Sequence, residues 1–316
     1  MWTFWSGFTD AANAISTVVG SRVLKPLAAV SLATTGNFLG IFFGEAVART
    51  LGSGIVLPEL ITSQFVVSII IGGLAFDVIT YIRGIPISET QVLVGALIGG
   101  GIAVAGFESV MIVSTLQKVL IPMAVAPVVA FIVGALIVLL ILRTSRRRSR
   151  SRVNRVYGRA QIGSSFFFSV SHGANDAMKS AGLMAALVFT QAGATGSFEV
   201  GLDLRFLAVG TLAAGTFFGG WRIVRTMGFK VTSLQPYQGF AAETGAAAVV
   251  IVSSQLGFPL STTQTVSGGI IGVGAIRRFS AVRWRIVREI VFTWLITIPA
   301  AGLFAFLTTA ILFRLI

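Results

Sequence analysis

Two acidic residues occur in the same motif at two places in otherwise apolar sequence. Asp10 lies in GFTDAAN and Asp176 in GANDAMK, and the amides Asn13 and Asn175 flank them. A charged residue at the centre of a membrane helix costs at least about 2.5–3.5 kcal/mol, so such acids are functional candidates. Carboxylate and amide oxygens suit Na⁺, and a carboxylate alone carries a proton. Lys179, on the same helical face as Asp176, is either its ion-pair partner or a substrate contact.

The remaining titratable residues are few enough to sort individually. Six of the eleven acids lie in apolar surroundings, namely Asp10, Glu45, Asp77, Glu89, Asp176 and Glu243. The other five lie in or beside predicted loops and need no special explanation. His172 is the one histidine, and we interpret it as a hydrogen-bonded polar residue rather than a catalytic one.

A second repeated motif combines proline, hydroxyl residues and an amide, as PISETQ at 86–91 and PLSTTQ at 259–264. Proline suits the first turn of a helix, so helices are predicted to begin at Ser88 and Ser261. A helix N-terminus offers unpaired N–H groups and about half a positive charge, which favours an anion. If both helices begin at mid-membrane, their N-termini face each other across one anion. Ordinary N-capping also explains either motif taken alone.

The two motifs recur in the same order, which indicates a duplication. In the first motif, Asp10 aligns with Asp176 and Thr9 with Asn175. In the second motif the aligned pairs are Pro86 with Pro259, Ser88 with Ser261, Thr90 with Thr263 and Gln91 with Gln264.

The low charge and high hydropathy of the chain indicate a protein embedded in a lipid bilayer. Only 11% of the 316 residues are charged, against about 25% in soluble domains, and the mean hydropathy is +0.90. The net charge of +13 does not indicate nucleic acid, because the basic residues lie between apolar runs, as the positive-inside rule predicts. The absence of cysteine excludes disulfides and thiol catalysis.

Ten apolar runs predict an all-α polytopic membrane protein. The predicted spans are roughly 8–21, 27–47, 62–82, 86–106, 119–142, 163–190, 205–221, 236–257, 259–276 and 286–313. They divide the chain into a first repeat over 1–142, a basic linker over 143–160 and a second repeat over 161–316. The linker holds eight arginines between 143 and 159, and anionic lipid is a possible partner for them.

The distribution of basic residues predicts the orientation. With the 143–159 linker placed in the cytoplasm, nearly all basic residues fall on that side, and little beyond Arg49, Lys118 and Arg205 remains outside. Both termini are then external, and each half has an odd number of crossings. The halves therefore have opposite orientations, which is the usual construction of secondary transporters.

The motifs together resemble the inorganic phosphate transporter (PiT) family, in its short bacterial form. GFTDAAN, SHGANDAMKSAG, PISETQ and PLSTTQ carry the resemblance, with GFAAETGAA and GVGAIRRFSAVRW in support, and it covers nearly the whole chain. It implies inverted repeats with broken helices and re-entrant half-helices in the cell membrane, commonly as a homodimer. The implied function is secondary active transport of phosphate with Na⁺ or H⁺ by alternating access, with no other cofactor and no enzymatic activity.

The resemblance also implies roles for individual residues. Phosphate contacts are assigned to Ser88, Thr90, Ser261, Thr262 and Thr263, and we add their neighbours Glu89, Gln91, Gln264 and Lys179. Cation sites are assigned to Asp10, Asn13, Asn175, Asp176 and Glu243, with Asp10 and Asp176 as Na⁺ ligands if sodium is the coupling ion.

Four positions depart from the family pattern. Thr9 stands in place of Asn or His, Glu89 in place of a small hydroxyl residue, and Gln91 and Gln264 in place of histidines. Glu89 adds a negative charge beside the predicted anion site. We therefore predict that it is protonated, or shares a proton with phosphate, in the loaded state. The alternative is that Glu89 faces solvent and caps a helix.

Two other functions use related chemistry. Sulfate is a second tetrahedral oxyanion, but only phosphate donates a hydrogen bond at pH 7, and a carboxylate such as Glu89 accepts that bond while repelling sulfate. An intramembrane lipid-diphosphate phosphatase is the more distant alternative. It requires arginine at the phosphate motif, and PISETQ and PLSTTQ contain none.

Overall fold

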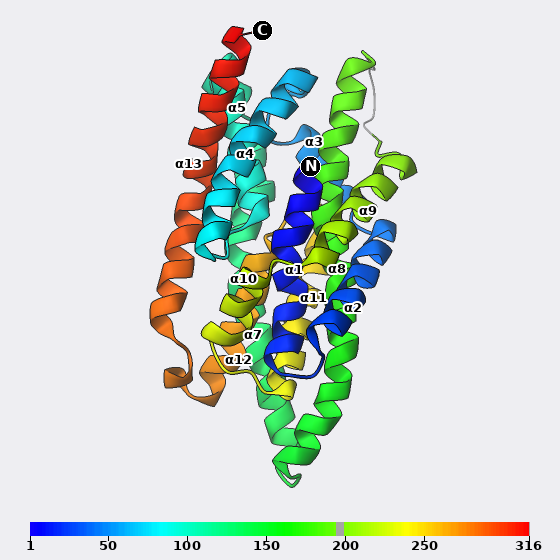
Figure 1. Cartoon of the computed structure of the whole chain (residues 1–316), viewed down its shortest axis with the longest axis vertical. Helices are drawn as coiled ribbons and strands as arrows, with labels where there is room; N and C mark the ends of the chain where they lie inside the picture. The colour runs from blue at the N-terminus through cyan, green and yellow to red at the C-terminus, as the bar shows by residue number, and fades with distance from the viewer. Residues whose placement is uncertain (194–198, 316) are drawn as a thin grey trace.

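The computed structural model describes residues 1–193 and 199–315, which form a bundle of long helices (Figure 1). The first half holds α1 (Trp2–Gly20), α2 (Pro26–Leu39), α3 (Glu45–Ser53), α4 (Ser63–Arg83), α5 (Glu89–Ala105), α6 (Ile112–Thr115) and α7 (Ile121–Thr144). The second half holds α8 (Arg150–Gln191), α9 (Leu202–Phe218), α10 (Trp221–Arg225), α11 (Pro236–Gln255), α12 (Thr262–Arg277) and α13 (Trp284–Leu315). Each predicted span overlaps a helix, and the span 27–47 covers α2, η1 and the start of α3, so the predicted all-α class is confirmed.

Several short segments connect these helices. The 3₁₀ turns are η1 (Gly40–Phe42), η2 (Pro58–Leu60), η3 (Phe107–Ser109) and η6 (Phe279–Ala281), and the π-helical segments are η4 (Leu116–Leu120) and η5 (Thr226–Lys230). Ile316, the last residue of the predicted second repeat, lies outside the described residues.

The second helical segment of each half is broken. α2 and η1 bend by 76° into α3, and α9 bends by 61° into α10 and η5. A break at the same place in both halves fits the duplication predicted from the motifs. It also gives each half one discontinuous helix, which is typical of transporters built from inverted repeats.

Matching turns precede α5 and α12. Gly84, at the end of α4, has a φ of 69°, and Gly257, just after α11, has a φ of 78°. Residues with a Cβ seldom adopt this conformation, so glycine permits the chain to reverse here. Pro86 and Pro259 follow within two residues, and α5 and α12 then begin. Figure 1 places α5 and α12 toward opposite ends of the bundle.

The outer helices are suited to lipid contact. By length and composition, 63–83, 112–144 and 284–315 are each able to cross a membrane, and the two bent pairs raise this number to five. Large apolar side chains are exposed along α7 and α13, including Val128, Leu136, Phe292 and Leu295. Exposed apolar surface of this extent requires a nonaqueous neighbour. The protein is therefore a multi-pass membrane protein.

The connection between the halves is shorter than the predicted linker of 143–160. α7 continues to Thr144 and α8 begins at Arg150, so only 145–149 lies outside a helix. Arginine is a good helix former, and all eight arginines of this region are exposed, so the backbone remains helical while the charges stay in solvent. The α7–α8 hairpin lies at the end of the bundle opposite the C-terminus (Figure 1).

Candidate functional site

The starts of α5 and α12 meet inside the bundle, as the two PxS motifs predict. Ser88 caps α5 by accepting the N–H of Gln91 at 3.1 Å, and Ser261 caps α12 by accepting the N–H of Gln264 at 3.2 Å. The Thr90 hydroxyl donates to the Leu260 carbonyl oxygen at 2.8 Å, which joins the two segments. The positive ends of the two helix dipoles therefore converge on one buried place.

Asp10, on α1, binds the start of α12. Thr263 donates from its hydroxyl to Asp10 Oδ1 at 3.0 Å. The amide of Asn13 donates to the hydroxyls of Thr262 and Thr263 at 3.2 and 3.0 Å. Oδ1 of Asn13 is buried without a donor. A buried acceptor without a partner requires an explanation, and a cation provides one.

Asp176, on α8, is surrounded by donors. Lys179 forms an ion pair with Asp176 Oδ1 and also donates to the hydroxyl of Thr90. The same ammonium group donates to the Leu260 carbonyl at 2.8 Å, and Thr262 donates to Asp176 Oδ2 at 2.9 Å. Lys179 therefore contacts both the acid and the α5 start; the predicted ion pair is present, and the substrate contact stays a prediction.

The contacts repeat between the halves with one change of charge. Asn13 and Lys179 each follow the repeated aspartate by three residues and therefore occupy equivalent positions. Asn13 donates to Thr263 of α12, and Lys179 donates to the equivalent Thr90 of α5. The second repeat thus has an internal cation where the first repeat has a neutral amide.

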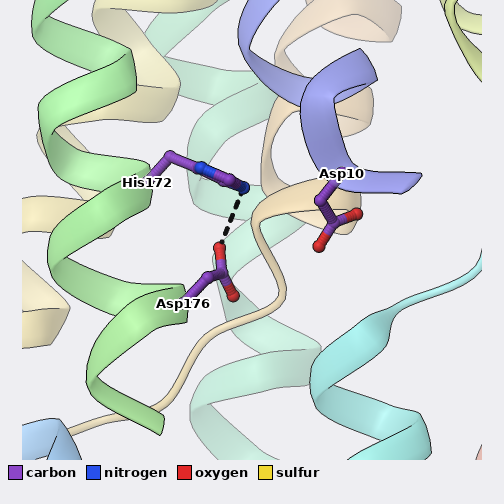
Figure 2. Close-up of side chains that lie close together, drawn as sticks. All are labelled: Asp10, His172 and Asp176. Carbon is purple, nitrogen blue, oxygen red and sulfur yellow. Dashed lines mark ion pairs between the residues drawn. The ribbon is translucent and has the colours of Figure 1, made fainter. Parts of the chain in front are cut away.

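His172 links the site to the broken helix α2. Figure 2 shows its ring directed at Asp176 on the same helix, with Asp10 on another helix across from both. Nε2 lies 3.2 Å from Asp176 Oδ2 but is not aligned for a hydrogen bond, and Nδ1 lies 3.0 Å from Asn37 Oδ1. Gly173 permits this approach, because a Cβ there would lie 2.1 Å from the Asn37 carbonyl oxygen. His172 is thus a polar partner, as predicted.

Glu89 is buried and does not face solvent. Its side chain is 4% exposed, and Thr9 donates a hydrogen bond of 2.6 Å to its Oε1. Its other oxygen has no donor. The carboxyl group of Asp77, on α4, lies beside it. The solvent-facing alternative for Glu89 is therefore wrong, and two positions that depart from the family pattern are in contact.

Glu243 lies in a separate polar cluster. It accepts hydrogen bonds from Thr17 of α1 and from Ser164 of α8, the latter at 2.7 Å. Thr17 is one helical turn beyond Asn13, and no hydrogen bond joins Glu243 to Asp10 or Asp176 among the described residues. Glu243 is fully buried, and its partners are hydroxyl groups rather than cations.

The remaining predicted site residues, Asn175, Gln91 and Gln264, lie beside the helix starts. Asn175 exchanges two hydrogen bonds with the backbone of Leu260, at 2.8 and 3.2 Å, so it fixes the α12 start instead of facing Asp10. The side chains of Gln91 and Gln264 are buried near the caps, and Oε1 of Gln91 has no donor.

Asp77 is the residue whose place the sequence did not predict. It was notable only as an acid in an apolar run, with no motif around it. Its side chain is 1% exposed, and neither oxygen has a hydrogen-bond donor. The site thus gathers the buried carboxyl groups of Asp10, Asp77, Glu89 and Asp176 around one ammonium group, that of Lys179. Such a site cannot take up an anion unless protons or metal cations balance the negative charge.

Comparison with known proteins shows the family. The model of the phosphate transporter family matches residues 6–305. The chain belongs to the phosphate transporter family. A probable low-affinity inorganic phosphate transporter of Rhizobium meliloti is 42% identical over 301 residues, covering 95% of this chain and 90% of the relative. A relative with the same description from Bacillus subtilis is 31% identical, with the same coverage.

A solved structure supports the same assignment. It is described as the sodium-dependent phosphate transporter, with a TM-score of 0.88, 25% identity, and coverage of all of this chain and 97% of that one. The family membership predicted from the motifs is thus confirmed. Its relatives are described as transporters or permeases, so this phosphate transporter family member is not an enzyme.

Proposed function

We propose that the protein is a secondary active transporter that carries inorganic phosphate through the membrane with Na⁺ or H⁺, by alternating access. The observation that carries the proposal is the meeting of the α5 and α12 N-termini beside buried carboxyl groups. Family membership and the descriptions of the relatives support phosphate as the substrate. The solved neighbour's description supports sodium among the coupling ions.

Phosphate fits the convergence of the helix starts. The hydroxyls of Thr90, Thr262 and Thr263 lie there, and Lys179 adds a positive charge. In this structure these groups bind each other and the two aspartates, so a bound phosphate replaces some of these contacts. Ser88 and Ser261 act through the backbone, because their hydroxyls hold the first turns in place.

Cations fit the first-repeat side of the same cluster. Asn13 Oδ1 is a buried acceptor without a donor, and it belongs to the same hydrogen-bonded group as Asp10. An amide oxygen and a carboxylate are ligands of the kind that hard cations prefer. On the second-repeat side Lys179 already neutralises Asp176, so we assign that carboxylate a smaller part in cation binding. Glu243, with its surrounding hydroxyls, is a second candidate.

Alternating access agrees with the closed state of the site. Ser88, Thr90, Asp10 and Asp176 are each at most 4% exposed, so substrate reaches them only after helices move. The broken segments supply mobile parts close by, because α2 carries Asn37, which contacts His172, and α9 carries Thr216, which contacts Asn37 at 2.8 Å.

The same proposal places the α7–α8 hairpin in the cytoplasm of a cell membrane. Supporting it, Arg83, Lys230, Arg283 and Arg285, from different connections, line one cavity, and Arg146, Arg148 and Arg150 of the α7–α8 hairpin line another. The external Arg49 and Arg205 instead pair with Glu45. The homodimer and the lipid contacts of the linker stay predictions.

Substrate exchange tests the proposal without reference to the coupling ion. Proteoliposomes loaded with labelled phosphate release the label when external phosphate is added, and excess sulfate fails to substitute. Liposomes without protein are the control. Release driven by sulfate but not by phosphate would assign the site to sulfate.

A further inference from the structure

We propose that Asp77 and Glu89 form a proton-binding pair beside the phosphate site, and that the proton held by this pair is a coupling ion of the transporter. The inference deepens the proposed function and rests on it. It concerns two acids from one repeat that a turn brings together, Asp77 near the end of α4 and Glu89 at the start of α5.

The two carboxyl groups face each other away from water. Their side chains are 1% and 4% exposed, and they lie within hydrogen-bonding reach of one another. Two buried carboxylates in contact repel one another, and each has lost its hydration. A single proton removes one charge and turns the contact into a hydrogen bond, as in paired carboxylic acids elsewhere.

The donors around the pair are too few for two ionised groups. Thr9 donates to Oε1 of Glu89, which leaves three buried oxygens, Oε2 of Glu89 and both oxygens of Asp77, without a donor. The indole N–H of Trp5 approaches Asp77 without the alignment of a hydrogen bond. A proton on either acid supplies the missing donor.

The surroundings favour a proton over a metal ion. Apart from the other acids of the site, the polar groups beside the pair are the Thr9 hydroxyl, which already donates to Glu89, and the Trp5 indole N–H, which is a donor and cannot bind a cation. A hard cation requires about six oxygen ligands, and these neighbours do not add enough to the carboxyl oxygens. Lys179 is not available either, because its ammonium group binds Asp176, Thr90 and Leu260.

The pair belongs to the first repeat alone. In the second repeat Thr262 occupies the position of Glu89, and Val250, nine residues before Pro259, occupies the position of Asp77. The second repeat also has Lys179 as its internal cation, where the first has Asn13. A proton on the acid pair removes one of its two negative charges, as Lys179 offsets the charge of Asp176 on the other side.

Nearby charges link this proton to the substrate. Asp10 and Asp176 act on the pair through their negative charge, and Lys179 opposes them in the same cluster. α13, which packs against both α4 and α5, carries charged residues only toward its ends, namely Arg285, Arg288, Glu289 and Arg314. An arriving phosphate anion adds negative charge and strengthens proton binding, and the bound proton strengthens phosphate binding in return.

Counting protons per transported phosphate tests the pair. Wild-type protein in proteoliposomes is supplied with phosphate at a fixed membrane potential, and a pH-sensitive dye records proton entry alongside labelled phosphate. Asp77→Asn is expected to move about one proton fewer per phosphate and to lose the stimulation of uptake by an acidic exterior. Glu108→Gln, at an exposed acid, is the matched control and keeps the wild-type ratio.

Three outcomes would overturn the proposed proton-binding pair. In the first, Asp77→Asn keeps the wild-type number of protons per phosphate. In the second, Asp77→Asn loses the Na⁺ dependence of uptake and keeps its proton dependence. The third is measured by infrared spectroscopy at pH 7, which does not require an active variant. The wild type should show a protonated carboxyl band that disappears in both Asp77→Asn and Glu89→Gln, and a band unchanged in both contradicts the pair. Wild-type protein that carries no phosphate at all would instead refute the proposed function.

Discussion

Thr9 donates a 2.6 Å hydrogen bond to Glu89, which lies 80 positions away in the sequence. Both residues depart from the pattern of the family that the motifs resemble, and their contact shows that the two departures form one local arrangement. The Thr9 hydroxyl supplies a hydrogen-bond donor for Glu89, the acid that stands where the family pattern has a small hydroxyl residue. We therefore expect the region between α1 and the start of α5 to be where this chain differs from its relatives in ion use.

The first prediction concerns Glu89 itself. Glu89→Thr is expected to fold, because it restores the small hydroxyl residue that the family pattern has at this position, and to flatten the pH dependence of phosphate uptake. Uptake is measured in proteoliposomes at several external pH values, with Glu108→Gln as the control. A pH profile identical to that of the wild type would remove Glu89 from proton coupling.

The second prediction concerns Asp10. Asp10→Asn is expected to abolish cation-driven uptake while the protein remains folded, because Asp10 accepts from Thr263 and shares this partner with Asn13, and no basic residue within the described parts of the chain is bound to either. Driven uptake and size-exclusion profiles are compared for the variant and the wild type. Near-normal driven uptake would mean that Asp10 serves packing only.

The third prediction separates Asp176 from Asp10 by stability. Asp176→Asn removes the partner of the buried Lys179 and is expected to cost about 3–5 kcal/mol, because an unpaired buried charge remains. Adding Lys179→Met should recover thermal stability in detergent but not transport. Equal melting temperatures for Asp176→Asn and Asp10→Asn would contradict the ion pair.

The fourth prediction concerns the helix caps. Ser88→Ala and Ser261→Ala each remove the acceptor of one backbone N–H and are expected to lower stability by about 0.5–2 kcal/mol. Because each cap also shapes a phosphate-binding helix start, the concentration of phosphate giving half-maximal uptake should rise. Ser53→Ala, at the half-buried last residue of α3, is the control. If neither serine substitution changes stability or uptake, the helix starts do not have the phosphate-binding role assigned to them.

Local chemistry explains which features the sequence could predict. The starts of α5 and α12 follow from Pro86, Pro259 and the serines after them, because a cap involves neighbours in the chain. The duplication and the pairing of Asp176 with Lys179 were likewise readable from spacing. The short connection between the halves was mispredicted, because a run of exposed arginines fits a helix as well as a loop.

Contacts between distant segments explain what the sequence missed. Asp77 has no motif, and its place beside Glu89 depends on how the Gly84 turn folds α4 against α5. Glu243 hydrogen bonds to Thr17 and Ser164, so it lies apart from Asp10 and Asp176, and its role at a cation site stays a prediction. The packing of α1, α8 and α11 decides which acids share a cluster, and no local pattern encodes that packing.

Driven uptake of labelled phosphate tests the central claim most directly. Purified protein in proteoliposomes is given an inward Na⁺ gradient, an inward H⁺ gradient or neither, with sulfate as competitor. The account predicts accumulation of phosphate above the equilibrium level under at least one gradient, no accumulation without a gradient, and little inhibition by sulfate. Equal uptake with and without both gradients, or accumulation of sulfate in place of phosphate, would contradict it.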